Sequence, residues 1–430
     1  MIPQSRHELA AGRARRIFYV VLFLCVIILG TMAVWRAAVG MMRTDYTVYI
    51  AAGQAALDHR DIYETRNAGG WRYVYPPPFA IPLAQLARLP IVLGAFLWTL
   101  FSMAAIALSF AMSANLLDIA PLKRKPHIIY GLPLLWLASL LASGLLRSQA
   151  SAFMIFFMLA ACWLSLKNRP VAAGFSLACA TLLKVFPVTL IVWFIARRQW
   201  RAVLATAIAL LVLGFVLPGL YWGWHFNLEQ IARWIDVVGH PAVMDNMARA
   251  QTSDLYKQLL DTAKPRNQSL ESLFLSLNMS AELARYAVAV CAAAMLAVMW
   301  AAARRIPVHS SRESEPDMAE NLLCGAFLCW SLLISPIAES HYFGVLLWPL
   351  VMLVGCAERG TPNRRLQFFV VGTVAMIAVM LLVALDATAI WRPLCIATFT
   401  LWWLCVRPAF GKTQCDTGDT ISPFSPWKLT

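Results

Sequence analysis

The sequence predicts an all-α, polytopic transmembrane protein with about 12 spans, and three observations predict it. Apolar residues make up 60% of the 430 residues and charged residues only 13%, whereas soluble proteins have roughly 45–50% and about 25%. Apolar runs recur along the whole chain, many of them long enough to cross a bilayer. Short clusters of Lys and Arg separate these runs, as in membrane proteins. The chain 1–430 is therefore expected to form a single integral membrane domain.

The first apolar run, residues 17–38, follows Arg13, Arg15 and Arg16. Basic flanks stay in the cytoplasm, so the N-terminus is expected inside, with the run retained as a signal anchor. Residues 39–89 then form a first periplasmic loop with helices along the interface. Prolines 76–78 interrupt the chain there, and residues 79–89 are too few to span.

The remaining apolar runs alternate across the membrane and leave one further large outer loop, residues 222–282. Basic clusters fall on the inner side in this arrangement, while the two outer loops are nearly neutral. Both termini are therefore predicted to be cytoplasmic, in a bacterial inner membrane, with a cytoplasmic tail at 408–430. The expected spans after the first are 90–113, 128–146, 150–166, 201–221, 283–303, 321–338, 342–356, 366–384 and 388–406.

Residues 170–196 do not fit a single straight span, because basic residues flank both ends. Two half-length helices that meet near Pro187 would keep both ends on the cytoplasmic side. This arrangement would place Lys184 near their apex. Broken helices of this kind are tolerated in membranes where they line a polar cavity.

Composition and motifs exclude several classes of function. The net charge of +14 lies in clusters between spans, which indicates membrane topology and not a nucleic-acid surface. The sequence has no phosphate-binding Walker loop, no GxGxxG after a strand and no DxD clamp for a metal and a nucleotide sugar. We therefore expect no cofactor, no metal site and no nucleic-acid partner. A lipid-borne substrate, which enters sideways from the bilayer, requires none of these motifs.

Asp45 is the candidate catalytic residue, because a carboxylate at the outer membrane boundary can act as general base toward a hydroxyl. It could instead cap a helix or pair with Arg43.

Three cationic or titratable residues are candidates for binding a phosphate: Lys184, His341 and Arg147. A lysine in mid-segment can hold a phosphate as a point charge, a histidine can donate a hydrogen bond, and a guanidinium grips phosphate. The alternatives are a snorkelling lysine, a plain surface histidine and an arginine bound to lipid headgroups. Asn267-Gln268-Ser269 fits either a glycosylation acceptor or a polar loop that contacts a sugar.

An ordered set of segments resembles glycosyltransferase family 87. The set runs from about residue 40 to 350. The chain departs from the family at one point: many members have Gly before the glutamine that corresponds to Gln149, where this chain has Arg147-Ser148. The matching segments are Asp45-Tyr46 through Tyr49, Asp61-Ile62-Tyr63, Tyr73-Val74-Tyr75-Pro76-Pro77, Gln149, Ala173-Gly174, Lys184-Val185-Phe186-Pro187, Arg197 to Arg201, Asn267-Gln268-Ser269 and Ser335-Pro336 with His341.

The resemblance implies a GT-C fold and a transferase that uses polyprenyl-phosphate mannose. It implies that Asp45 is the base and that Lys184 and His341 serve the donor phosphate. We expect Arg147 to join them in that role. The residues expected to bind substrate are Arg43, Tyr46, Tyr75, Gln149, Asn267 and Gln268. The partners would be a polyprenyl-phosphate-linked sugar donor, a glycan or glycolipid acceptor and membrane lipid. Two other functions fit the sequence, a transporter or flippase of lipid-linked sugars and a non-enzymatic scaffold for envelope assembly.

Overall fold

The structure is a computed structural model that describes residues 6–39, 44–117, 126–239, 266–306, 317–359, 370, 372–373 and 392–410. These residues form helices and loops without any β-strand, which confirms the predicted all-α class. Extended pairing in the same residues is limited to two isolated bridges, Arg66 with Arg72 and Asn267 with Glu339.

Five helical segments of the described chain are long and apolar enough to cross a membrane. Six shorter apolar helical segments accompany them, so the expected number of twelve spans stays a prediction. The long segments are α1 (Arg6–Ala38), α4 (Ile91–Asn115), α10 (Trp200–Leu211) continued by the π-helix η5 (Val212–Val216) and α11 (Leu217–Trp222), α16 (Ala281–Arg305), and η8 (Ser340–Leu346) with α18 (Leu347–Arg359). The shorter ones are α6 (Gly131–Leu146), α7 (Ser151–Leu166), α8 (Pro170–Leu183), η4 (Phe186–Leu190) with α9 (Ile191–Ala196), α17 (Met318–Leu333), and α21 (Pro393–Val406) with η9 (Arg407–Ala409).

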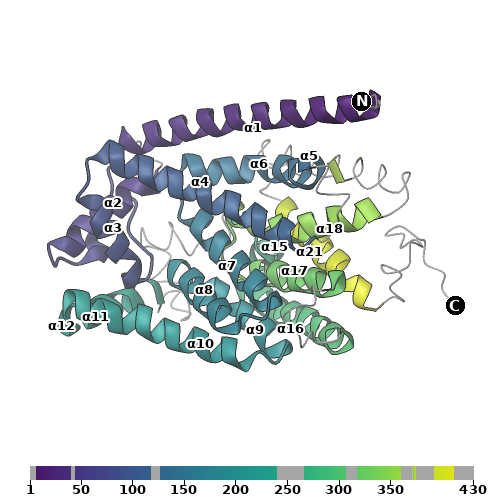
Figure 1. Cartoon of the computed structure of the whole chain (residues 1–430). Coiled ribbons are helices and arrows are strands. Elements are labelled where there is room, and N and C mark those ends of the chain that lie inside the picture. Colours follow the sequence, from purple (N-terminus) through teal and green to yellow (C-terminus); the bar gives the residue numbers. More distant parts are fainter. Residues whose placement is uncertain are drawn as a thin grey trace.

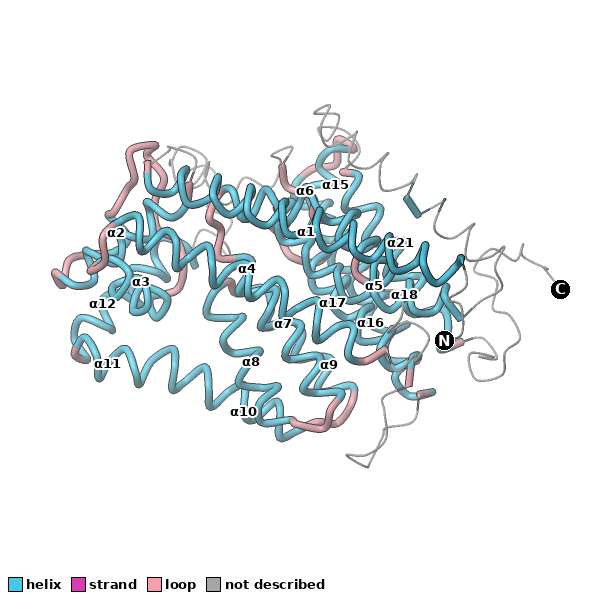
Figure 2. The backbone as a smooth tube through the Cα atoms, turned by 45° about the horizontal axis from the view of Figure 1, so that its top comes forward, coloured by secondary structure: helices cyan, strands magenta, loops and turns pink. Residues whose placement is uncertain are grey.

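The long helices run side by side, and short helices gather at one end of the molecule (Figure 1). That end holds α2 (Asp45–Leu57), α3 (Ala80–Ala87), α11 and α12 (Trp224–Trp234), while the labelled N-terminus lies at the opposite end. The tube view shows the same separation (Figure 2). α1 packs along α4 and α6 and exposes most of its apolar side chains, as a lipid-facing helix does.

Within the predicted loop 39–89, the described residues 44–89 form short helices, and their position along the membrane interface stays a prediction. α2 is followed by the 3₁₀ turns η1 (Ile62–Glu64) and η2 (Pro77–Phe79) and then by α3, whose eight residues are too few to span a bilayer. α2 and α3 approach closely at Gly53, where a Cβ would lie 2.4 Å from the carbonyl oxygen of Leu83. Only glycine therefore permits this contact, and the contact fixes α2 on α3.

The segment 170–196 is divided as expected, into α8 and the pair η4–α9. The reason is local. Pro187 has no amide hydrogen for the carbonyl of Leu183, four residues earlier, so the helical hydrogen-bond ladder cannot pass this point. α8 accordingly ends at Leu183, and Lys184 adopts an extended conformation with φ −150° and ψ 136°.

α17 lies at the centre of the bundle, and nearly all of its residues are buried. Asp317 caps its start by accepting a hydrogen bond from the amide of Ala319. One turn into α17, Glu320 forms an ion pair with the buried Arg197 at the end of α9. Arg197 also donates hydrogen bonds to the carbonyls of Ala303 and Ile306, so a single guanidinium joins the ends of three helices.

Several of the sequence predictions fall partly outside the described residues, among them the expected span 388–406, which is described from residue 392. The expected span 366–384 is described only at residues 370 and 372–373, and the tail 408–430 only as far as residue 410. The predicted outer loop 222–282 is described at 222–239, which contains α12 and the π turn η6 (Ile235–Gly239), and at 266–282, which contains α15 (Leu270–Ser276). A further short helix, α5 (Pro126–Ile129), precedes α6.

We expect Gly174→Ala to destabilise the protein, because α8 and α10 touch at this glycine. A Cβ on Gly174 would lie 2.3 Å from the carbonyl oxygen of Ala202, and forcing helices apart typically costs about 1–3 kcal/mol. Thermal unfolding of the purified protein in detergent measures the loss. Gly214→Ala is the matched control, since its Cβ would meet only a Leu182 methyl group at 3.4 Å. Equal unfolding temperatures for the two variants would contradict this account of the α8–α10 contact.

Candidate active site

Asp45 is the first residue of α2 and is held in place by the turn between α6 and α7. Its amide donates a 2.9 Å hydrogen bond to the carbonyl of Arg147, the residue after α6. A carboxylate at this position also gains from the positive end of the helix dipole. Asp45 therefore sits where a loop of the bundle meets the short helices, with its side chain partly accessible. Arg43 lies outside the described residues.

A chain of tyrosines supports the Asp45 carboxylate from within the protein. The Tyr49 hydroxyl lies 3.5 Å from Asp45 Oδ2, one helical turn away on α2. The same hydroxyl is 2.8 Å from the hydroxyl of Tyr75 and accepts a hydrogen bond from the amide of Ala150. Burial raises the pKa of both tyrosines well above 10, so both stay neutral and can donate. The hydroxyl of Tyr49 can thus point its proton at Asp45 while Tyr75 donates to Tyr49.

Lys184 lies near Asp45 but is held by aromatic rings. Its Nζ is 3.7 Å from the centre of the Tyr342 ring and 5.8 Å from that of Tyr75. Phe186 stacks on Tyr342 with the ring planes 10° apart, which keeps this platform in position. A cation over a ring face is stabilised by the ring quadrupole. The ring does not neutralise the ammonium, so Lys184 can still attract an anion.

His341 is buried, with 2% of its surface exposed, and neither ring nitrogen has a hydrogen-bond partner among the described residues. Its Nδ1 lies 3.6 Å from Oε2 of Glu339, beyond normal hydrogen-bond distance. A buried polar group without a partner costs free energy, so it calls for a ligand or another explanation. The histidine that could have been a plain surface residue is therefore an enclosed one.

Two cations and two carboxylates form one electrostatic cluster around these groups. Burial raises the pKa of Asp45 to about 7. The positive charges of Lys184 and Arg147 and the Tyr49 hydrogen bond oppose this rise, while the negative charge of Glu339 adds to it. An aspartate with a pKa near 7 can take up a proton and release it at neutral pH, as a general base must. The structure thus brings together Asp45, Lys184, Arg147 and His341, which come from four separate parts of the chain.

The other sequence candidates lie around this cluster in different ways. Tyr75 belongs to it, through Tyr49 and Lys184. Tyr46 points away, with its fully buried hydroxyl against Gly94, where a Cβ would lie 2.3 Å from that oxygen. Gln149 is also buried, in the turn beside Arg147.

Asn267 and Gln268 bind the backbone of neighbouring segments. The Asn267 side chain donates to the carbonyl of Pro336 and accepts from the amide of Ala338. Gln268 accepts from the amide of Leu394. Asn267 therefore shapes the segment that carries Glu339 and His341, and Gln268 ties it to α21.

Three residues of the cluster were not among the sequence candidates: Tyr49, Glu339 and Tyr342. Tyr49 could have been found from its spacing of four residues after Asp45, which puts both on one helix face. Glu339 and Tyr342 flank His341, but nothing in their spacing distinguishes them from ordinary loop residues.

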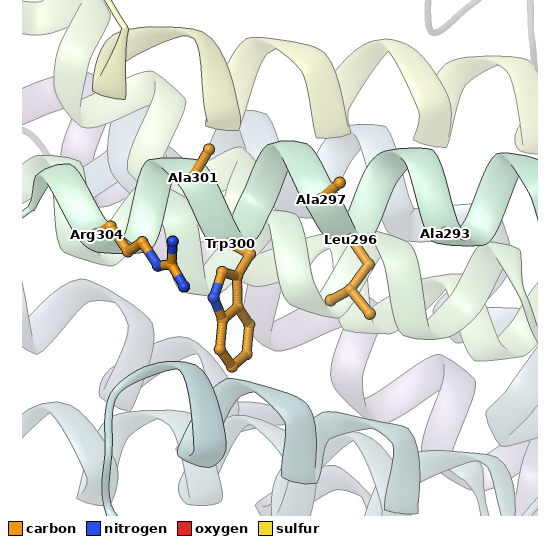
Figure 3. A pocket seen from close by; sticks show the side chains of 6 residues that line it. All are labelled: Ala293, Leu296, Ala297, Trp300, Ala301 and Arg304. Carbon is orange, nitrogen blue, oxygen red and sulfur yellow. The ribbon is translucent and has the colours of Figure 1, made fainter.

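A separate surface groove of about 460 Å³ lies on α16, and none of its lining residues belongs to the cluster (Figure 3). Three alanines line it, together with Leu296, Trp300 and Arg304. It contains no group that could serve as a base, so we place the chemistry at the Asp45 cluster.

Comparison with known proteins decides the family. The profile of glycosyltransferase family 87 matches residues 73–336, more than half of the chain. The chain belongs to glycosyltransferase family 87. As a member of this family it is a glycosyltransferase and a multi-pass membrane protein.

Two relatives align with the chain over most of their length. A polyprenol-phosphate-mannose-dependent alpha-(1-2)-phosphatidylinositol mannoside mannosyltransferase from Mycolicibacterium smegmatis is 24% identical, over 89% of this chain and 88% of that protein. The protein of the same description from Mycobacterium tuberculosis is also 24% identical, over 94% and 93%. No solved structure matches the chain. The family match itself begins after Asp45 and ends before Glu339 and His341, so the geometry carries the assignment of these residues.

We expect Asp45→Asn to stabilise this family 87 protein, and more so at high pH. The folded protein keeps a proton on Asp45 up to pH about 7, whereas the unfolded chain releases it near 3.8. The folded state binds more protons between these values, so stability falls as pH rises through this window. Asparagine does not titrate, so the variant does not lose stability in this way. Thermal unfolding at pH 5 and pH 8 should show a larger gain for the variant at pH 8.

Asp58→Asn is the control for this prediction, because Asp58 is an exposed carboxylate at the other end of α2. Its pKa is lowered by the hydrogen bond from Arg60, so its removal should give no gain at pH 8. A gain of equal size in both variants would show that burial of Asp45 is not the cause.

Proposed function

We propose that this glycosyltransferase moves mannose or another hexose from a polyprenyl-phosphate donor to a hydroxyl of an envelope glycan or glycolipid. The reaction takes place on the periplasmic face of the bacterial inner membrane, with both termini in the cytoplasm. The relatives' use of polyprenol-phosphate mannose supports the donor class. The single observation that carries the mechanism is the Asp45 cluster, in which a carboxylate with a pKa of about 7 lies beside the cations Lys184 and Arg147.

The chemical step needs one base and one anion-binding region. The acceptor oxygen attacks the anomeric carbon, its proton passes to Asp45, and the bond from that carbon to the phosphate oxygen breaks. Polyprenyl phosphate leaves with the electron pair, and the configuration at the anomeric carbon inverts. The phosphate is a stable anion and leaves without a proton, so a second carboxylic acid of the kind that most glycosidases use is not required.

Lys184, His341 and Arg147 stabilise the negative charge that grows on the departing phosphate. Lys184 supplies a point charge from its aromatic platform. The unpartnered nitrogens of His341 supply a hydrogen bond. Arg147 acts from the turn that also fixes the Asp45 backbone, so donor and base are positioned by one structural unit.

The substrate-binding residues divide into two groups in this proposal. Tyr75 and Gln149 lie next to the cluster and contact the sugar, as Arg43 would just before α2, whereas the buried Tyr46 supports α2 from within the protein. Asn267 and Gln268 act indirectly, because their hydrogen bonds to backbone groups hold the segment 336–341 in shape.

Release of polyprenyl phosphate by the purified protein tests the proposed function. The protein, in detergent or vesicles, is incubated with a panel of polyprenyl-phosphate sugars and a glycolipid acceptor. We expect Asp45→Asn to lower kcat by roughly 10²–10⁴, because the general base is lost, while donor binding remains. Asp58→Asn is the matched control and should retain full activity, since Asp58 is exposed at the far end of α2. Full activity of Asp45→Asn would refute the mechanism.

Lys184→Gln tests the phosphate-binding role separately. Loss of one charge-assisted contact should raise KM for the donor roughly 10–100-fold, with a smaller effect on acceptor KM. Lys184→Arg should recover part of this loss, because it restores the charge but not the compact ammonium. A variant that fails equally toward donor and acceptor would indicate a structural role. Donor titration by initial rates at fixed acceptor gives both constants.

A further inference from the structure

Helix α12 has an unusual distribution of side chains, because it buries polar residues and exposes large apolar ones. Asn227 and Gln230 are 0% and 2% exposed, whereas Trp224 is 46% and Leu228 51% exposed. A helix on a water-facing surface shows the reverse pattern. This distribution indicates that the exposed side of α12 contacts an apolar medium.

The buried polar side chains are satisfied by the protein itself. Asn227 Nδ2 donates a 3.1 Å hydrogen bond to the carbonyl of Phe215, and Gln230 Oε1 accepts a 3.1 Å hydrogen bond from the amide of Ile62. Trp234 Nε1 donates to the carbonyl of Val74 on the same side. These hydrogen bonds thus attach this face of α12 to the loop that follows α2 and to η5.

The remaining surface of α12 divides into two further faces at helical spacing. Trp224, Leu228 and Ile235 are exposed and lie four and seven residues apart, which puts them on one line. His225, Glu229 and Arg233 follow at i, i+4 and i+8 and form a charged, exposed face beside it. A helix with protein, water and apolar faces fits a position where all three environments meet.

The apolar face of α12 continues the lipid-facing surface of the preceding helix. The candidate span that ends at Trp222 exposes apolar side chains along its length, and Gly223, with φ +86°, turns the chain from it into α12. α12 therefore starts where that span ends, at the boundary of the hydrocarbon. The exposed members of the span's apolar surface are Leu204, Ile208, Leu211, Leu217 and Leu220.

We propose that α12 is an interfacial helix whose apolar face, Trp224, Leu228 and Ile235, is inserted in the lipid leaflet on the side of the Asp45 cluster. Tryptophan favours this depth because its ring is amphipathic, and the charged face would remain in the headgroup and water layer. The charged face carries both signs, so the partner is the bilayer itself and not one anionic headgroup. This inference does not depend on the proposed transferase mechanism.

The same helix connects the membrane surface to the loop after α2. On its charged face, Arg233 pairs with Asp61 at 2.6 Å and with Glu64 at 3.3 Å. Asp61 begins the turn η1 that follows α2. Insertion of α12 would therefore hold this loop, and with it the helix that begins at Asp45, at a fixed depth relative to the leaflet.

Photocrosslinking of the full-length protein in vesicles tests the inference. A benzophenone amino acid replaces Leu228 in one variant and Glu229 in another, in vesicles of phosphatidylethanolamine and phosphatidylglycerol. After irradiation, mass spectrometry identifies the adducts. We expect phospholipid adducts at position 228, in a yield comparable to that at position 208 on the exposed face of α10, and none at position 229. All three side chains are exposed, so the substitutions should not disturb packing.

Three outcomes would overturn the proposal. Equal lipid adducts at 228 and 229 would mean that α12 is not oriented as proposed. A covalent dimer formed at 228 would identify a second copy of the chain as the occupant of the apolar face. An adduct of 228 with a peptide of the same chain would show that the face is covered by protein.

Discussion

Pro187 cannot donate an amide hydrogen to the carbonyl of Leu183, and the interruption of the helical ladder at this point is the constraint on which the site depends. α8 ends there, Lys184 becomes extended, and the following 3₁₀ turn brings Phe186 onto the ring of Tyr342. In an unbroken helix, Lys184 would be one residue of a regular helical turn within the bundle. The break leaves the ammonium on an aromatic platform beside Asp45 instead.

The position of Asp45 depends on a second local feature, the tight contact between the short helices α2 and α3. Gly53 lets α2 lie against α3, and the Asp45 amide binds the turn after α6. These backbone contacts fix the start of α2, and the Tyr49 hydroxyl lies 3.5 Å from the carboxylate. Its high pKa follows from that burial, because desolvation outweighs the attraction of Lys184 and Arg147. The same burial that weakens the folded state gives Asp45 the pKa that the proposed general base requires at neutral pH.

The opposite end of the bundle is held by different chemistry. Arg197 and Glu320 form a buried ion pair, and Arg197 also binds the last carbonyls near α16. A buried pair of this kind gives specificity of arrangement more than net stability. α17 begins at this ion pair and packs against η4, α16, α18 and α21. The cluster thus belongs to a bundle whose far end is fixed independently of it.

The sequence by itself determined the all-α membrane class, the short helices of 44–89 and the break near Lys184, because these follow from composition, run length and proline chemistry. Apolar runs and basic clusters are local signals, and a missing amide hydrogen acts on its own helix whatever surrounds it. It also singled out Asp45, Lys184, Arg147 and His341, since ionisable residues near membrane depth are rare enough to be noticed.

Tertiary structure alone decided how these residues meet and which others join them. The platform of Tyr342, the Tyr49–Tyr75 pair and the enclosure of His341 depend on packing between segments more than a hundred residues apart in some cases. The backbone role of Asn267 and the inward direction of Tyr46 likewise could not be read from spacing. A pattern in one segment carries no information on the distance to another, because that distance is set by the packing of the whole bundle.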